Sequence, residues 1–163
     1  MKTLAMSGAP AVLLTIASLS LTAVMPAQAA LGDPELIIYR FPGVRDFGGA
    51  PDTGVATVFH CTNFSGVGET IRIVVRAADG TLKANIAENI GHLTTFTIGT
   101  HNTVLYLEDR IMVTGALGQG TVAIAATSVN IICTAMTIDA ASASPVGIAL
   151  RGIRFNPAPG SQE

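Results

Sequence analysis

Residues 69–89 read ETIRIVVRAADGTLKANIAEN, and this stretch decides the fold class. Its first half alternates: positions 71, 73 and 75 are Ile, Ile and Val, while positions 72, 74 and 76 are Arg, Val and Arg. A period of two is typical of a β-strand with one buried and one wet face. Asp79-Gly80 then supplies a hairpin turn, because glycine adopts a positive φ without steric cost. The stretch therefore predicts two antiparallel strands, 69–77 and 82–89.

The rest of the chain repeats short strand-like runs separated by Gly, Pro, Asn and Asp. Further strands are predicted at 35–41, 55–63, 93–98, 104–107, 111–114, 121–126, 129–138 and 146–155. The connection 42–54 (PGVRDFGGAPDTG) is the longest predicted loop, and 64–68, 115–120 and 140–145 are shorter ones. No helical period interrupts this pattern after residue 29. The sequence predicts an all-β antiparallel sandwich.

Residues 1–29 have the features of a secretory signal peptide. Lys2 supplies a positive charge, residues 11–24 (AVLLTIASLSLTAV) form an uncharged apolar run, and Pro26 ends that run. Ala27-Gln28-Ala29 is the small-x-small pattern of a cleavage site. The apolar run is shorter than the roughly 20 residues that span a bilayer, and 121–138 is interpreted as two buried strands. We expect cleavage after Ala29, one domain at 30–163, secretion or a periplasmic location, and no integral membrane segment.

The charge content argues against several partners. Loss of Lys2 with the signal peptide would change the formal net charge only from −2 to −3, and 12% of the residues are charged. No run of basic residues suits nucleic acid or an anionic lipid surface. The sequence has no Trp and eight Phe and Tyr residues, so we expect an aliphatic core.

Cys61 and Cys133 are the two cysteines of the chain. In an oxidising compartment an even pair predicts a disulfide, and no second Cys or His pair lies nearby at metal-ligand spacing. A bridge between Cys61 and Cys133 would close a long loop and contribute about 4 kcal/mol to the free energy of unfolding in the chain-entropy model. The linkage of an early strand to a late one resembles the inter-sheet disulfide of immunoglobulin-like sandwiches. More broadly, the chain resembles the small secreted β-sandwich proteins of bacteria. These resemblances imply an immunoglobulin-like sandwich with an inter-sheet bridge.

The three histidines are weak candidates for metal ligands. His60 neighbours Cys61 and is expected to point to the opposite face of its strand. His92 and His101 stand at the entry and the exit of one predicted strand, about a strand's length apart, so a converging metal site is not expected. If a copper or zinc ion binds, His92 or His101 is the candidate ligand.

Several charged residues are candidates for binding. Arg45, Asp46 and Asp52 share the predicted loop 42–54, where they either line a binding site or are simply solvated. Glu108-Asp109 is an acidic pair before Arg110, but no D-x-D-x-D pattern predicts calcium binding. Arg72 and Arg76 share one exposed strand face, which either meets an anionic or glycan partner or is solvated.

The sequence predicts binding or assembly rather than catalysis. It contains neither G-x-S-x-G nor H-E-x-x-H, Ser65 lies in a glycine-flanked turn, and the Gly66-Val67-Gly68 stretch lacks the Lys of a phosphate loop. No cofactor is expected. We expect a non-enzymatic module that meets a protein or an envelope polymer. The alternative is a small-ligand or metal carrier that uses the 42–54 loop and a histidine.

Overall fold

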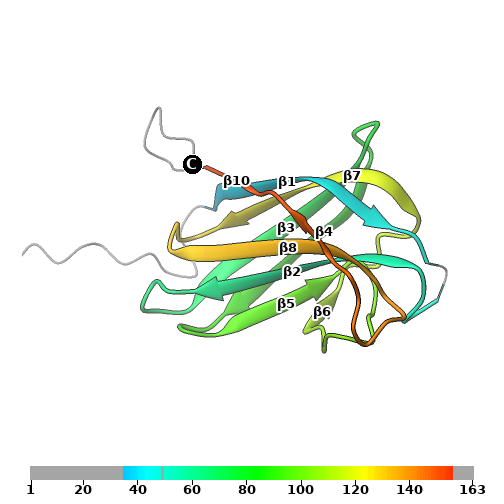
Figure 1. Cartoon of the computed structure of the whole chain (residues 1–163). Helices are drawn as coiled ribbons and strands as arrows, with labels where there is room; N and C mark the ends of the chain where they lie inside the picture. Colours follow the sequence, from blue (N-terminus) through cyan, green and yellow to red (C-terminus); the bar gives the residue numbers. More distant parts are fainter. Residues whose placement is uncertain (1–34, 49, 156–163) are drawn as a thin grey trace, which may run out of the picture.

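The computed structural model describes residues 35–48 and 50–155, which form two β-sheets packed face to face (Figure 1). Sheet A has the strand order β10-β1-β7-β3-β4, and sheet B has the order β6-β5-β2-β8-β9. All pairings are antiparallel except that of β5 with β6. The predicted all-β sandwich is confirmed. The strands are β1 (Leu36–Asp46), β2 (Val55–Asn63), β3 (Glu69–Ala77), β4 (Leu82–Ile90), β5 (Thr95–Gly99), β6 (Arg110–Ile111), β7 (Leu117–Ala126), β8 (Ile131–Asp139), β9 (Ile148–Leu150) and β10 (Ile153–Arg154).

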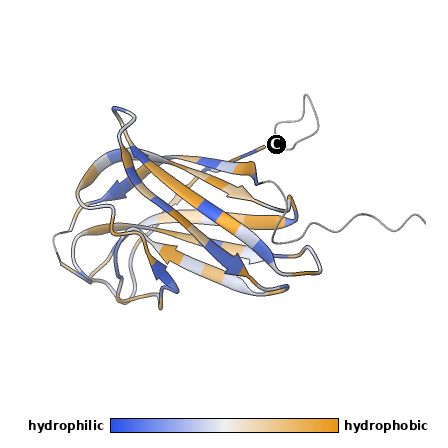
Figure 2. Cartoon of the chain, turned by 180° about the vertical axis from the view of Figure 1, so that it is seen from behind, coloured by the Kyte–Doolittle hydropathy of each residue, from blue (hydrophilic) through white to orange (hydrophobic). Residues whose placement is uncertain are grey.

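The hairpin of β3 and β4 has the predicted form. Ile71, Ile73 and Val75 are fully buried, and the alternation of apolar and polar residues along the strands is visible in Figure 2. Gly80 takes a φ of 86° in the turn, and the Thr81 N–H donates to the Asp79 carboxylate (2.9 Å). The period of two in the sequence was therefore a sound guide to burial.

The core between the sheets is mainly aliphatic, as the composition predicted. Phe41 of β1 and Phe59 of β2 meet edge to face, with ring centroids 5.6 Å apart. Around this pair pack fully buried branched side chains, including Ile38, Ile73 and Ile124. Burial of each such side chain contributes roughly 1.5–3 kcal/mol.

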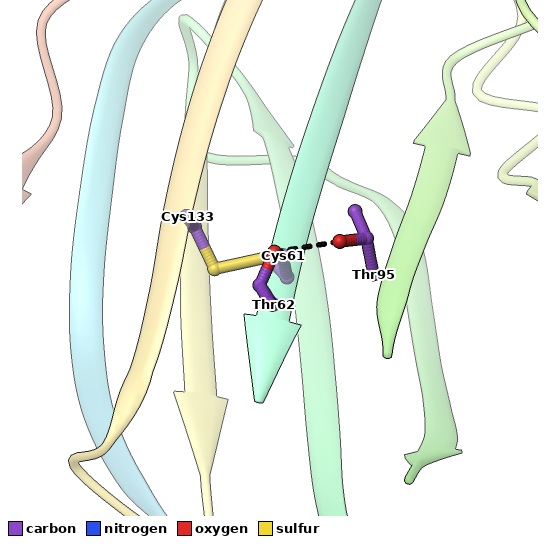
Figure 3. The surroundings of a disulfide bond; sticks show 4 residues. All are labelled: Cys61, Thr62, Thr95 and Cys133. Carbon is purple, nitrogen blue, oxygen red and sulfur yellow. Dashed lines mark hydrogen bonds between the residues drawn. A yellow bond between two sulfur atoms is a disulfide. The ribbon is translucent and has the colours of Figure 1, made fainter. Parts of the chain in front are cut away.

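The Cys61–Cys133 disulfide is present, but it does not join the two sheets. The cysteines face each other on β2 and β8, which are neighbours in sheet B (Figure 3). Their Cα atoms are 4.1 Å apart, the close approach of opposed residues in an antiparallel ladder. The predicted inter-sheet bridge is wrong, because strands 72 positions apart in the sequence are adjacent in the sheet. Both cysteines point into the core.

The predicted loop 42–54 is too long, because β1 continues through Pro42 to Asp46. Proline has no N–H to donate, so it fits in a strand where no neighbouring strand needs that hydrogen bond. β10 pairs with β1 only at Tyr39 and Arg40. The side of β1 beyond Arg40 is therefore not paired to β10. Gly43, with a φ of 82°, and a register shift between Pro42 and Val44 absorb the irregularity.

Later predictions also differ from the structure. The strand predicted at 111–114 is reduced to β6 (Arg110–Ile111), and β7 begins at Leu117, inside the predicted loop 115–120. Residues 104–107 lie in the β5–β6 connection and form no strand. The predicted strand 146–155 is divided: β9 pairs with β8 in sheet B, and β10 pairs with β1 in sheet A. Between them Gly152 packs so closely on Phe41 that a Cβ there would lie 2.5 Å from the ring. This final segment thus crosses from one sheet to the other along one side of the sandwich.

The predicted signal peptide and its cleavage after Ala29 lie outside the described residues, as does the tail 156–163. Within the part that is described, no helix is long and apolar enough to cross a bilayer.

Candidate functional site

Several connections meet at one end of the sandwich, which we call the loop end. They are the β1–β2, β5–β6, β6–β7 and β8–β9 connections. Backbone hydrogen bonds tie them together: Asp52 N–H donates to the Asn102 carbonyl (3.1 Å), Val104 N–H to that of Ala140 (2.8 Å), and Ala140 N–H to that of Gly54 (2.7 Å). The β1–β2 connection is closed at its base by Phe47 and Val55, which bond each other in both directions. These hydrogen bonds hold the connections of the loop end in place relative to one another.

A cluster of hydrogen-bonded polar side chains lies beneath the surface of the loop end and links its connections. The Asp46 carboxylate at the end of β1 is 2.7 Å from His101 Nδ1, and its other oxygen accepts from the Thr114 hydroxyl at 2.5 Å. His101 Nε2 lies 2.9 Å from the Thr53 carbonyl. Carboxylate and carbonyl oxygens are both hydrogen-bond acceptors, so each ring nitrogen of His101 faces an acceptor. The cluster joins three connections through one carboxylate.

This cluster brings together two residues that the sequence marked separately. Asp46 and His101 were each candidates, and Asp46 was predicted in the loop 42–54, either lining a binding site or solvated. It is instead 2% exposed at the end of a strand. Thr114 was missed, because a threonine between Val113 and Gly115 carries no signal in the sequence. Burial of a carboxylate depends on partners that only the fold supplies.

A pocket of about 260 Å³ opens beside the cluster. Its walls come from the β1–β2, β5–β6 and β6–β7 connections, and they include Asp46, Pro51, His101, Asn102, Ile111 and Val113. The titratable groups in it already bond to each other or to the backbone. The Thr114 hydroxyl donates to Asp46, so it does not face the histidine as a nucleophile would. The arrangement can hold a small molecule or brace a surface.

Val113 on the rim of the pocket combines two unfavourable features. Its φ of 50° lies in the left-handed region, which a β-branched residue rarely adopts. Its side chain is also 78% exposed. Such backbone strain tends to occur at functional positions.

Other connections at the loop end also expose large apolar side chains. Phe47 is 61% exposed, Leu107 95% and Val146 94%, and Val104 is half exposed. Together with Val113 they are contributed by four connections. Large exposed apolar side chains at one end of a domain indicate a candidate contact surface.

The remaining predicted residues do not converge on one site. Arg45 is exposed near the end of β1, and Asp52 is exposed in the β1–β2 connection with a φ of 57°. Arg72 and Arg76 share the outer face of sheet A, as predicted from their spacing. His92 accepts from the Gly66 N–H (3.0 Å) in the β4–β5 connection, at the end opposite the loop end.

His60 points outward from sheet B, opposite to Cys61, as predicted. Its ring packs edge to face on Tyr106, with centroids 4.6 Å apart, and Nδ1 lies 3.1 Å from the Thr97 hydroxyl. Partial burial lowers the pKa of His60, and the charge of Glu108 acts in the opposite direction. The fold therefore favours the neutral ring.

Glu69 is a buried carboxylate that sequence reasoning missed. It is fully buried at the start of β3 and accepts a hydrogen bond from the Thr127 hydroxyl. Its other oxygen has no hydrogen-bond partner among the described residues. A signal existed: Glu69 has the same parity as Ile71 and Ile73, so the period of two places it inward.

Within residues 35–48 and 50–155, no group of three or more His, Cys, Asp or Glu side chains could hold a metal ion. Comparison with protein families, with curated proteins and with solved structures gives no match.

Proposed function

We propose that this chain is a secreted or periplasmic, non-enzymatic β-sandwich module that binds or assembles at the cell envelope through its loop end. The observation that carries the proposal is the set of exposed apolar side chains on four braced connections. The N-terminal signal pattern supports the location. An immunoglobulin-like classification belongs to the same proposal and is supported by the two packed sheets.

The loop end suits binding better than catalysis. The Asp46–His101–Thr114 cluster has no free nucleophile or base, because each group is engaged by the fold. The loop end exposes apolar side chains to which a partner could bind. Most energy at protein contacts comes from a few such buried side chains.

Sedimentation with the envelope fraction of the producing cells tests this function. The variant Leu107→Ser/Val113→Gly removes apolar area at the loop end. The control Leu93→Gly/Ile132→Ser removes similar side chains elsewhere, and Leu93 shares the left-handed backbone of Val113 (φ 58° against 50°). We expect the wild type and the control to pellet with the envelope and the loop-end variant to stay in solution. Equal behaviour of all three proteins would contradict the proposal.

A small-ligand carrier is the second candidate, favoured by the pocket of about 260 Å³ beside His101. Native mass spectrometry of protein recovered from the extracytoplasmic fraction, without reductant, tests it. We expect the mass of residues 30–163 less two hydrogens plus a bound molecule, and loss of that molecule in Ala50→Phe, which narrows the pocket. Recovery of the wild type without added mass would exclude the carrier.

A further inference from the structure

The outer face of sheet A carries arginines around small side chains. Residues directly opposed on neighbouring strands share a face, and Arg40 of β1, Ala123 of β7 and Val74 of β3 are opposed in one row. Arg72 and Arg76 flank Val74 at two-residue spacing and so point the same way. In neighbouring rows Ala125 faces Arg72, and Thr121 faces Arg76. The face is a patch of small side chains bounded by three guanidinium groups.

The arginines on this face differ in how they are held. Arg72 makes a bidentate pair with Glu35 (2.6 and 3.1 Å), which partly neutralises it. Arg76 donates to the Gly80 carbonyl (2.9 Å), and Arg40 lies over the Phe155 ring, 5.7 Å from its centroid. A carbonyl and a ring face do not neutralise a cation. Arg40 and Arg76 therefore keep this face electropositive.

The loop end has the opposite charge. Exposed Asp52 and Asp109 lie on its connections, and exposed Asp139 is the last residue of β8. Two arginines lie in the same region: Arg45 is exposed near the end of β1, and Arg110 pairs with Glu88 at 3.1 Å. The three exposed aspartates outnumber these two cations, so the excess charge is negative. The exposed apolar side chains of Phe47 and Leu107 belong to the same connections as Asp52 and Asp109. The loop end is thus apolar with an acidic surround, and the sheet A face is apolar with a basic surround.

We propose that the loop end of one copy docks on the sheet A face of a second copy. The apolar side chains of the loops cover Val74, Ala123 and Ala125, and the carboxylates meet Arg40 and Arg76. The two surfaces are different patches, so the contact is heterologous, and repetition yields a ring or an open filament. This inference rests on the proposed function, since it names the partner of the same loop end.

Complementary variants give a sharp test. A face variant, Arg40→Glu/Arg76→Glu, keeps an intact loop end. A loop-end variant, Leu107→Ser/Val113→Gly, keeps an intact face. Arg151→Glu reverses an exposed arginine outside the face and serves as the control. Circular dichroism and urea unfolding of each purified protein establish that it is folded before association is measured.

Sedimentation velocity over a concentration series, at low and high salt, is the measurement. We expect the wild type and Arg151→Glu to form oligomers that grow with concentration and weaken with salt, because exposed charge pairs are screened. Each double variant alone should be monomeric. Their equimolar mixture should form a species of two chains and nothing larger. The intact loop end of the face variant can bind the intact sheet A face of the loop-end variant, and no other intact pair of surfaces remains.

Three outcomes would overturn the inference. They are a wild type that stays monomeric throughout, double variants that associate as the wild type does, and a mixture that stays monomeric. A wild type that pellets with the envelope fraction as a monomer overturns self-docking and leaves the proposed function intact. Self-association without envelope binding leaves self-docking intact and contradicts the envelope role.

Discussion

Val113 holds a left-handed backbone, at a φ of 50°, in a residue with a branched side chain. That conformation costs roughly 1–2 kcal/mol, and glycine would relieve it at the expense of a more flexible unfolded chain. We therefore expect Val113→Gly to raise the free energy of unfolding by up to about 1 kcal/mol, while weakening any contact made by the loop end. Urea unfolding gives the stability. A lower midpoint in the variant would show that Val113 stabilises the fold.

His60 predicts a pH dependence with a definite sign. Because partial burial lowers the pKa of His60 in the fold, the unfolded chain takes up a proton first, near pH 6.5. Stability from this residue is therefore complete above that pH and is lost as the pH falls toward the folded pKa. The urea midpoint should drop less between pH 7.5 and 5.5 in His60→Gln than in the wild type. An equal drop in both proteins would assign the effect to groups other than His60.

At the residue scale, what the sequence predicted depended on parity. Period-two reasoning placed Ile71, Ile73 and Val75 inside and His60 outside, because a strand leaves each side chain only two directions. It did not predict the contact of Asp46 with His101 and Thr114, because these residues come from connections whose paths no local pattern determines. Residues with local signals were placed correctly, and residues defined by long-range contact were not.

At the element scale, Gly152 is the close contact in the segment that crosses between the sheets. An added Cβ would lie 2.5 Å from one ring carbon of Phe41 and 2.7 Å from another, and Phe41 is 1% exposed. We expect Gly152→Ala to destabilise the fold by about 1–3 kcal/mol through overpacking.

Gly68→Ala is the matched control for that substitution, because a Cβ there would meet nothing within 4 Å. We expect it to leave the stability unchanged or to raise it by up to about 1 kcal/mol. Thermal unfolding of both variants compares them. A Gly152→Ala protein as stable as its control would mean that the crossing segment can shift away from Phe41.

The errors of the sequence prediction also have element-scale causes. Pro42-Gly43 was interpreted as the start of a loop, yet β1 continues because its side beyond Arg40 is not paired to β10. Residues 146–155 were interpreted as one strand because apolar runs do not show which sheet they join. A break at a single glycine becomes visible only when both neighbouring strands are in place.

At the scale of the whole molecule, the Cys61–Cys133 bridge acts on the unfolded chain. It closes a loop of 72 positions and restricts the unfolded ensemble, while in the fold it links strands already paired in sheet B. We expect reduction to lower the free energy of unfolding by about 4 kcal/mol. The denaturant slope should rise, because the reduced chain exposes more surface. Guanidinium unfolding with and without reductant measures both, and an unchanged midpoint would contradict this role.

Both ends of the described chain lie at the same end of the sandwich. The Phe155 N–H donates to the Ile38 carbonyl (2.8 Å), so the last described strand finishes beside the start of the first, at the end opposite the loop end (Figure 1). An affinity tag, a fluorescent label or a solid support attached beyond either position would therefore leave the same surface pointing away from the attachment. In atomic force microscopy, a protein attached to the tip through either terminus should give the same adhesion force on a given surface.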